Sequence, residues 1–450
     1  MNSINVGTMI DQSKFNHFHG LVLFWCAFII VFDGYDLVIY GSVLPSLMKE
    51  WSLTPNQAGA LGSAALIGMM LGALIFGPLA DKIGRKSVIL FCIALFSLFT
   101  GLIGISNNSL EFGIYRFIAG LGLGGVMPNA IALMTEYSPR SLKSTLVSIM
   151  FSGYSIGGML AAGLAIIMLG QFGWRSLFFV GAFPLLLLPL MYKTLPESPR
   201  FLLNKNESNK IGKILTKVNP TFTYRENQTF EQMKTEEAGA PVIKLFKSGR
   251  ALSTIMFWIC FFMCLLMIYG LNTWLPKLMD SAGLSVSGLM FLFVLNFGAI
   301  FGAVFGGRLA DKWSPKAVLL IFFTLAGVSL TLLGLVNNIV LVYVLVAFAG
   351  ASTIGTQIIT NAYISQYYPT EMRSSGLGWA LGIGRLGAIS GPLIGGVLLT
   401  MNLPFYQNFL VFAIPGILGA LALCFVQESY SSSKARERYL KEESLTSDVQ

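Results

Sequence analysis

Long apolar stretches alternate with short polar ones along almost all of the 450 residues. Each apolar stretch is about 20 residues long, which is the length that an α-helix needs to cross the hydrocarbon core of a bilayer. The pattern therefore predicts an all-α polytopic membrane protein. We expect twelve transmembrane helices, at residues 21–43, 58–80, 88–106, 111–134, 145–169, 175–195, 252–275, 286–309, 317–336, 339–363, 377–400 and 405–427.

One long polar segment, residues 196–251, separates the predicted helices into two sets of six. The expected organisation is an N-terminal segment (1–20), a six-helix bundle (21–195), the central loop (196–251), a second six-helix bundle (252–427) and a tail (428–450). The tail is charged and rich in serine, and we expect it to be disordered.

The composition agrees with a membrane protein, because 54% of the residues are hydrophobic and only 11% are charged. Soluble domains carry about 25% charged residues, so a soluble enzyme is excluded, and the predicted helices contain no nucleophile–base pair. All five cysteines lie inside apolar runs, while His17 and His19 lie in the polar N-terminal segment and are expected to be solvated. The sequence therefore predicts no metal site and no cofactor.

The basic residues orient the chain. If the N-terminus is cytoplasmic, the inner segments hold 25 of the 30 Lys and Arg residues and the outer loops hold three, while Arg116 and Arg385 lie inside predicted helices. Basic residues gather on the cytoplasmic side of membrane proteins, so we expect a multi-pass protein of the plasma (inner) membrane with both termini in the cytoplasm. The net charge of +9 is spread over many short loops, which argues against a nucleic-acid partner.

The two halves repeat each other at an offset of 230 residues. Duplicated halves are typical of secondary transporters, whose substrate site lies near the bilayer midplane between the halves. The three matches at this offset pair Asp81 with Asp311, Glu136–Pro139 with Gln366–Pro369, and Gly157 with Gly387.

The short loop after the second predicted helix is dense in glycine and charge. Gly77 is expected to let two helices approach closely. Asp81 is expected to cap a helix N-terminus or to pair with Arg85. An ion pair that forms in one conformation and breaks in another would act as a gate. The alternative is a basic loop that only sets the orientation of the chain.

Two acids lie inside the first predicted helix. Asp33 and Asp36 are three residues apart and share one helical face, roughly 18–24 Å from its cytoplasmic end at 1.5 Å per residue. Two carboxylates this close in a low dielectric cannot both ionise at low cost, so one of them is expected to carry a proton near neutral pH. Gly34 between them would permit local unwinding. The alternative is a structural pair bonded to the backbone or to an arginine.

Arg385 is the complementary charge, because it lies about 18 Å into the eleventh predicted helix, at a depth similar to that of the aspartates. A guanidinium in a cavity is a natural bidentate partner for a carboxylate, either of Asp33 or Asp36 or of an anionic substrate. Arg116 lies near the outer end of the fourth helix and is expected to pair with an aspartate or to anchor the outer leaflet. Glu136, about 30 Å away at the inner end, is expected to join the gate.

Polar and aromatic residues elsewhere in the helices are candidates for lining a substrate site. Gln357 and Asn361 share one face of the tenth helix, and Asn272 lies in the seventh. Tyr35 and Trp274 could stack on a planar ligand. Any one of these aromatic residues could instead be packed or face lipid.

Three motifs resemble those of the major facilitator superfamily: Gly77–Lys86, Arg116–Gly122 and Pro196–Arg200. The resemblance covers roughly residues 20–427 and implies two pseudo-symmetric six-helix bundles. It also implies conformational gate residues at Gly77, Asp81, Gly84, Arg85, Asp311 and Arg373. The fifth helix lacks the Gly-Pro pair that is typical of antiporters, which favours symport or uniport.

The run Asp33-Gly34-Tyr35-Asp36 is similar to the first-helix signature of the aromatic acid:proton symporter family. The resemblance implies an importer of benzoate, hydroxybenzoates or related ring carboxylates, driven by protons. We expect the protein to be a monomer in the bilayer. The resemblance assigns proton coupling and gating to Asp33, Asp36 and Glu136. It places functionally important charges at Arg116, Glu136, Arg373 and Arg385. Together with the polar and aromatic candidates above, the expected substrate contacts are Arg385, Arg116, Tyr35, Asn272, Trp274, Gln357 and Asn361. Nicotinate, a sugar or an organic cation stay open as alternative substrates, as does a receptor that transports nothing.

Overall fold

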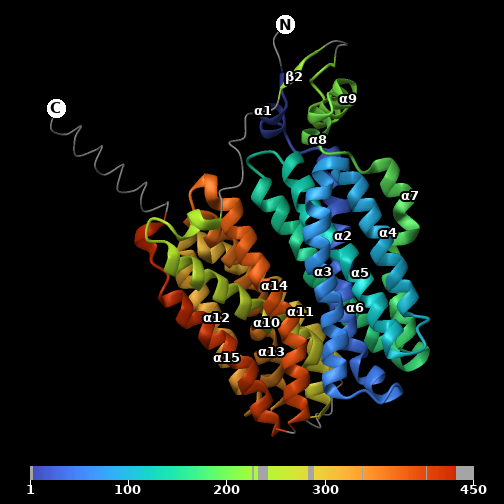
Figure 1. Cartoon of the computed structure of the whole chain (residues 1–450), viewed down its shortest axis with the longest axis vertical. Helices are drawn as coiled ribbons and strands as arrows, with labels where there is room; N and C mark the ends of the chain where they lie inside the picture. Colours follow the sequence, from blue (N-terminus) through green and yellow to red (C-terminus); the bar gives the residue numbers. More distant parts are fainter. Residues whose placement is uncertain are drawn as a thin grey trace, which may run out of the picture. The chain divides into compact units, whose positions relative to one another are not determined.

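The structure is a computed structural model that describes residues 4–224, 228–231, 242–281, 288–336, 338–401 and 403–431. Long α-helices dominate it (Figure 1), and the all-α fold predicted from the sequence is confirmed. The long helices are α2 (His17–Glu50), α3 (Pro55–Ile83), α4 (Arg85–Ile103), α5 (Ser109–Tyr137), α6 (Lys143–Gly181), α7 (Pro184–Thr194), α10 (Ala251–Ser281), α11 (Gly288–Lys312), α12 (Pro315–Leu333), α13 (Ile339–Tyr367), α14 (Thr370–Thr400) and α15 (Phe405–Cys424).

Within the described ranges, 11 helical segments are long and apolar enough to cross a membrane, against twelve predicted. The difference lies in the segment Thr145–Thr194, which is 50 residues long and counts as one span. Gly173 interrupts this segment with a φ of 71°, a conformation that glycine adopts without steric cost. The fifth and sixth predicted spans are therefore both present, joined by a tight break at this glycine.

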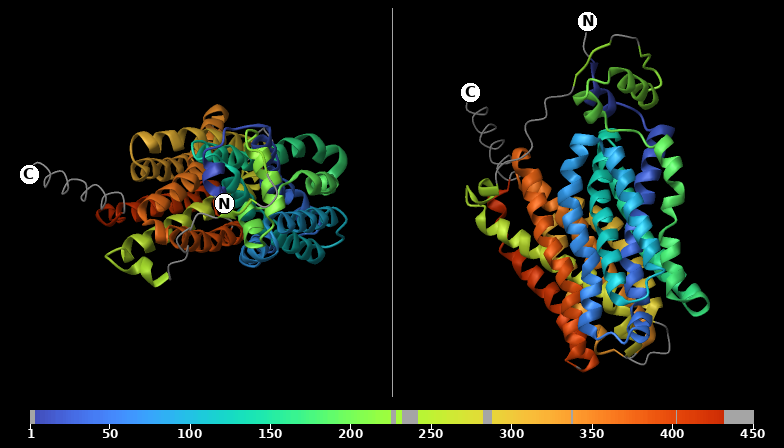
Figure 2. Two further views of the ribbon diagram at one scale, coloured as in Figure 1. Left: turned by 90° about the horizontal axis from the view of Figure 1, so that it is seen from above. Right: turned by 45° about the vertical axis from the view of Figure 1, so that its right-hand side comes forward.

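Short elements gather around the start of the chain. They are β1 (Ile4–Asn5), α1 (Val6–Asp11), α8 (Pro199–Asn204), α9 (Ser208–Val218) and β2 (Phe230–Glu231). β1 pairs with β2 in parallel, and in Figure 2 these elements lie together beyond one end of the long helices of the same unit. Two 3₁₀ turns, η1 (Val242–Phe246) and η2 (Glu428–Tyr430), complete the described elements. The predicted tail beyond residue 431 lies outside the described residues.

The N-terminal segment is more ordered than the sequence suggests. Asn16 caps α2 by accepting hydrogen bonds from the backbone N–H groups of Phe18 and His19. Its amide also donates to the carbonyl oxygens of Lys217 and Val218, at 2.9 and 3.0 Å, and so ties the start of α2 to the end of α9. The expectation of a solvated His19 is wrong, because this side chain is fully buried and completes the capping box with Asn16.

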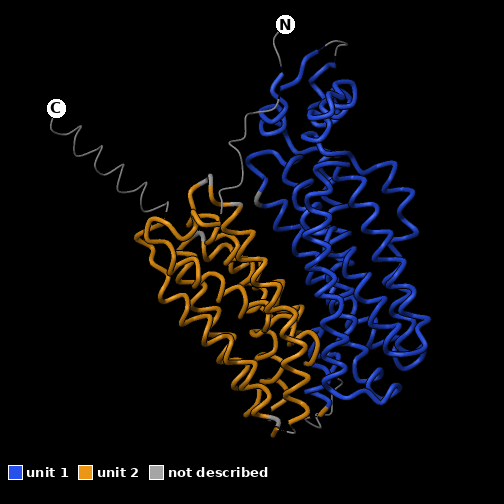
Figure 3. The backbone as a smooth tube through the Cα atoms, in the orientation of Figure 1, with its two compact units in different colours: residues 1–235, 275–280, 285–293 blue, residues 236–274, 281–284, 294–450 orange. Residues whose placement is uncertain are grey.

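The chain folds into two compact units (Figure 3). Unit 1 comprises residues 1–235, 275–280 and 285–293, and unit 2 comprises residues 236–274, 281–284 and 294–450. α2 to α9 belong to unit 1, and α12 to α15 belong to unit 2. One boundary falls inside the predicted central loop, and the part of that loop with α8 and α9 belongs to unit 1. The other boundaries fall between residues 274 and 294, inside the second predicted bundle.

Glycines allow close contacts between helices in both units, for example α3 against α5 in unit 1 and α11 against α13 in unit 2. A Cβ atom on any of these glycines would collide with a backbone carbonyl oxygen of the facing helix, so only glycine fits. The glycines and the oxygens they meet are related by the offset of 230, which confirms the internal repeat. The pairs are Gly68–Phe117, Gly72–Leu121 and Gly120–Ala65 in unit 1, and Gly298–Ala347, Gly302–Ala351 and Gly350–Leu295 in unit 2.

Two other glycines behave differently from the expectation. α2 is helical throughout, so Gly34 does not unwind it. Gly34 instead lets α6 approach, because a Cβ atom there would collide with the carbonyl of Tyr154. The expected close contact at Gly77 is absent, since no described atom lies within 4 Å of the place where its Cβ would be.

Candidate functional site

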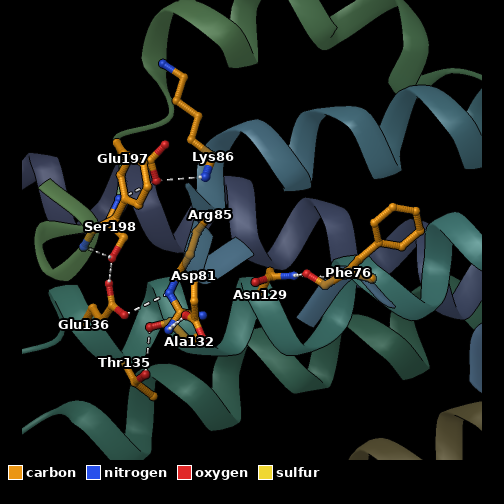
Figure 4. A network of polar contacts seen from close by, with 12 residues as sticks. Phe76, Asp81, Arg85, Lys86, Asn129, Ala132, Thr135, Glu136, Glu197 and Ser198 are labelled. Carbon is orange, nitrogen blue, oxygen red and sulfur yellow. Dashed lines mark hydrogen bonds and ion pairs between the residues drawn. The ribbon is translucent and has the colours of Figure 1, made fainter. Parts of the chain in front are cut away.

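Charged residues form a connected network at one end of unit 1, which we call the basic end and define by Asp81, Arg85, Glu136, Glu197 and Ser198 (Figure 4). Arg85 donates from Nε to Glu136 Oε1 at 2.9 Å and lies 3.7 Å from Asp81. The side chains of Arg85 and Glu136 are only 14% and 18% exposed, whereas that of Asp81 is 69% exposed. The ion pair with Glu136 is therefore the better shielded of the two and the stronger.

The segment after α7 completes this network. Ser198 donates its hydroxyl to Glu136 Oε2 at 2.5 Å, so the two oxygens of Glu136 have different partners. Glu197 accepts hydrogen bonds from the backbone N–H groups of Lys86 and Ser198, at 3.1 and 2.8 Å. Gly84 has a φ of 99°, and a Cβ atom there would collide with the Glu197 carboxylate. The glycine thus gives the carboxylate access to the start of α4.

A small cavity of about 100 Å³ opens beside the network, lined by Asp81, Arg85, Ser198 and Arg200 among others. A polar cavity of this size holds a few water molecules. Water can therefore reach Arg85 and exchange with its ion-pair partners when they separate.

The predicted gate residues are only partly brought together. Asp81, Gly84 and Arg85 meet at the basic end, and Asp81 pairs with Arg85 without capping α4, whose N-cap residue is Gly84. Arg373 is exposed in the first turn of α14 in unit 2. The side chain of Asp311 lies outside the described residues, although its backbone belongs to α11.

Asp33 and Asp36 are buried in the middle of α2, at 0% and 2% exposure. Asp36 accepts a hydrogen bond from the hydroxyl of Thr100 in α4, at 3.0 Å. Ionised carboxylates gain more from such a bond than protonated ones. Thr100 therefore bears directly on the equilibrium between the two forms of Asp36.

Arg116 lies buried in α5, with 2% exposure. Its guanidinium stands over the ring of Tyr40 in α2, 4.6 Å from the ring centroid. The charges of Arg116 and Asp36 interact electrostatically, yet no carboxylate of the described residues forms an ion pair with Arg116 within 4.0 Å. Within the described part of the chain, Nε and Nη1 of Arg116 have no hydrogen-bond partner. A buried guanidinium with unused donors can accept an anion.

Arg385 lies in α14 of unit 2 and is partly buried. Its Nη1 donates to the phenol oxygen of Tyr269 in α10, at 3.3 Å. The separation between Tyr40 and Tyr269 in the sequence is close to the repeat offset, so Tyr269 occupies nearly the same place in unit 2 as Tyr40 does in unit 1. Each unit thus holds one arginine of its helices against a tyrosine of its first long helix. The predicted pairing of Arg385 with Asp33 or Asp36 would join the two units and stays a prediction.

The other predicted lining residues differ in their surroundings. Tyr35 donates to the carbonyl of Leu177 at 2.8 Å, and Trp274 donates to the carbonyl of Pro392 at 2.9 Å. Both rings are buried in packing within their own units. Asn272 is buried and receives a hydrogen bond from Asn296 at 3.3 Å. The remaining two residues, Gln357 and Asn361 on α13, are partly buried. Oδ1 of Asn361 has no hydrogen-bond partner among the described residues.

Several residues of these sites were not expected from the sequence, namely Tyr40, Thr100, Tyr269, Glu197 and Ser198. Hydroxyl and aromatic residues are common in membrane helices, so nothing in the sequence separates these from the rest. The segment Pro196–Arg200 did stand out as a motif. Its contact with Glu136 depends on folding and could not be read from spacing.

Comparison with known proteins gives a consistent picture. Residues 26–304 and 258–447 match the Major Facilitator Superfamily. The chain is 48% identical to the benzoate transport protein of Acinetobacter baylyi over 434 residues, which cover 94% of this chain and 93% of that protein. It is 36% identical to the gallate transporter of Pseudomonas putida, covering 93% of this chain and 94% of the relative.

The solved structures agree at the level of the fold. The inward-open xylose transporter XylE from E. coli matches with a TM-score of 0.73, over 91% of this chain and 96% of that one. The sequence identity is 18%, so this likeness speaks for the fold and not for the substrate.

Proposed function

Because the chain belongs to the Major Facilitator Superfamily and, within it, to the aromatic acid:proton symporter family, we propose that it imports benzoate together with protons by alternating access. The observation that carries the proposal is the buried acid Asp36 in α2, with Thr100 on its carboxylate and the charge of Arg116 nearby. An acid in this setting can take up and release a proton inside the membrane. The relative at 48% identity is a benzoate transport protein, which favours benzoate over hydroxylated ring acids.

Proton coupling follows from charge balance. Benzoate is an anion at neutral pH, and an interior-negative membrane potential opposes its entry by about 2.3 kcal/mol per 100 mV. One proton carried with each anion cancels this charge. Protonation of Asp36 would also free Arg116 from its electrostatic partner, so that its unused donors could serve the substrate anion.

Arg385 is proposed as the second anchor for the substrate carboxylate. Its contact with Tyr269 orients the guanidinium, whose planar shape suits a carboxylate. Arg385→Lys keeps the positive charge but loses the planar fork that binds a carboxylate through two parallel bonds. Equilibrium binding of labelled benzoate should weaken by roughly 10- to 150-fold, the cost of one hydrogen bond to a charged group. Full-affinity binding would remove Arg385 from the substrate site.

The basic end of unit 1 is proposed as a gate. The ion pair of Arg85 with Glu136 is largely shielded from solvent, which stabilises it. Water reaches Arg85 through the adjoining cavity and can replace Glu136 when the pair separates. Gly77, Asp81 and Gly84 shape the surrounding loop. Asp311 and Arg373 are proposed as the corresponding residues of unit 2. Asp81→Asn should leave substrate binding intact and lower transport, whereas normal transport would mean that the loop only sets the orientation.

The distribution of Lys and Arg supports a location in the inner membrane with both termini in the cytoplasm. The basic end of unit 1 then faces the cytoplasm. We also propose that the protein works as a monomer, since each chain contains both units that an alternating-access carrier needs.

Uptake into proteoliposomes tests the function. Labelled benzoate should accumulate when the outside is acidic, and a protonophore should abolish the accumulation. Accumulation that survives the protonophore would refute proton symport. A competition panel of benzoate, 4-hydroxybenzoate, gallate, gentisate and nicotinate then tests the substrate, and benzoate is expected to compete best.

A further inference from the structure

A hydrogen bond at the basic end of unit 1 has a counterpart in unit 2. Tyr137, the last residue of α5, donates its phenol O–H to the carbonyl oxygen of Glu197 at 2.5 Å. Tyr367, the last residue of α13, donates in the same way to the carbonyl oxygen of Gln427 at 3.0 Å. The two donors and the two acceptors are each 230 residues apart. In each unit, the repeat therefore includes a tyrosine whose hydrogen bond holds the backbone of the segment that follows the last long helix.

In unit 1 this fastened segment takes part in an ion pair. Tyr137 is fully buried and holds the backbone of Glu197, which leads directly to Ser198. The hydroxyl of Ser198 reaches Glu136, the neighbour of Tyr137 in the chain, on the oxygen that Arg85 does not use. Glu136 is thus shared between a guanidinium from the start of α4 and a hydroxyl that Tyr137 keeps in place.

In unit 2 the equivalent tyrosine hydrogen bond is present, but the ion pair of unit 1 has no counterpart. The positions equivalent to Arg85 and Glu136 are Pro315 and Gln366, so an ion pair cannot form there. The segment is held by other contacts. Arg250 donates to the carbonyl of Tyr430 at 3.2 Å, and Tyr363 donates to Glu428, the counterpart of Ser198, at 3.4 Å. Ser253 accepts from the backbone N–H of Gln427 at 3.0 Å, and Lys316 donates to the carbonyl of Val426 at 2.8 Å.

We propose that Tyr137 is a positioning residue of the unit 1 gate, whereas its repeat counterpart Tyr367 is a structural fastener that takes no part in gating. Tyr137 sets the place of Ser198 and thereby the stability of the state in which Glu136 and Arg85 are paired. It lies 21 residues along α5 from Arg116, about 30 Å at 1.5 Å per residue, so it is remote from the proposed substrate anchors. The inference rests on the gate described under the proposed function.

The matched variants Tyr137→Phe and Tyr367→Phe each remove one hydroxyl from equivalent places. Both are measured in proteoliposomes, by equilibrium binding of labelled benzoate and by the maximal uptake rate per binding site. Tyr137→Phe should lower that rate about 3- to 10-fold, the range for one lost hydrogen bond, and leave the affinity unchanged. Tyr367→Phe should lower the melting temperature but leave the rate per binding site unchanged.

A double-mutant cycle with Glu136→Gln tests the route of the effect. If Tyr137 acts through Glu136, Tyr137→Phe should cause no further loss of rate in the Glu136→Gln background. Additive losses, equal losses in Tyr137→Phe and Tyr367→Phe, or a full rate in Tyr137→Phe would each overturn the inference. If Tyr137→Phe yields no folded protein, Ser198→Ala is measured instead. This substitution removes the hydroxyl that donates to Glu136 and should produce the same loss of rate.

The unaltered protein separates this inference from the proposed function. If it neither binds nor takes up benzoate, the proposed substrate is wrong, and the cycle is repeated with the ring acid that it does carry. If it transports benzoate normally and Tyr137→Phe does too, only the role of Tyr137 is refuted.

Discussion

Thr100→Val offers a direct test of the proposed proton site. Valine has nearly the same shape as threonine, so the substitution removes the hydroxyl that donates to Asp36 at 3.0 Å and little else. A hydrogen bond to an ionised carboxylate contributes about 1.5–3 kcal/mol, and one to a neutral acid about 0.5–1.5 kcal/mol. The variant therefore disfavours the ionised form of Asp36 by about 1–1.5 kcal/mol relative to the protonated form.

This difference corresponds to a shift of about 0.7–1.1 pH units, at 1.36 kcal/mol per unit. Its sign is upward, because Asp36 then holds its proton at a higher pH. The measurement is benzoate counterflow in proteoliposomes with equal pH on both sides, which removes the contribution of the proton gradient. The pH at which the protonation-dependent step is half-maximal should rise by that amount in Thr100→Val.

The control is Ser97→Ala, one helical turn away in α4. Ser97 is equally buried, and its hydroxyl has no hydrogen-bond partner among the described residues. Its removal should leave the pH midpoint unchanged. An unshifted midpoint in Thr100→Val would separate Asp36 from the proton path, and an equal shift in both variants would mean that α4 was disturbed in general.

Three further outcomes are expected. Asp36→Asn, which imitates a permanently protonated acid, should still bind benzoate but fail in gradient-driven uptake; normal uptake would exclude Asp36 as proton carrier. Tyr269→Phe should weaken benzoate binding about 2- to 10-fold, because it releases Arg385. Tyr40→Phe keeps the ring under Arg116 and should leave benzoate binding unchanged. Equal effects of the two substitutions would contradict this account. Gly72→Val should abolish the yield of folded protein, because a side chain there meets the backbone of α5; a stable variant in a thermal-shift assay would refute this.

The long helices could be predicted because a bilayer fixes the length of an apolar segment. The boundaries could not, since hydropathy marks only the part of a helix inside the hydrocarbon. α2 was expected over residues 21–43 and runs over His17–Glu50, with Asn16 as its cap. The offset of 230 was visible from a few matches. The contact of Gly298 with Ala347, which repeats that of Gly68 with Phe117 at this offset, was found only in the structure.

The candidate sites were predictable only in their charged members. An ionised group costs several kcal/mol inside a membrane, so Asp36, Arg116 and Arg385 stand out in a sequence with 11% charged residues. Their neutral partners Thr100 and Tyr269 come from other helices. Contacts between helices depend on how each helix is rotated, and one sequence does not contain that information.

The parallel pairing of β1 with β2 imposes an order on the synthesis of the protein. Ile4 leaves the ribosome at the start, but Phe230, its partner in the register, is made 226 residues later. At 5–20 residues per second this delay is roughly 11–45 s. During that time α2 to α7 must enter the membrane while the N-terminal strand waits. When β2 emerges, it can pair with β1 before the ribosome has made α10. The part of unit 1 up to residue 235 can therefore assemble first, and residues 275–280 and 285–293 join it later.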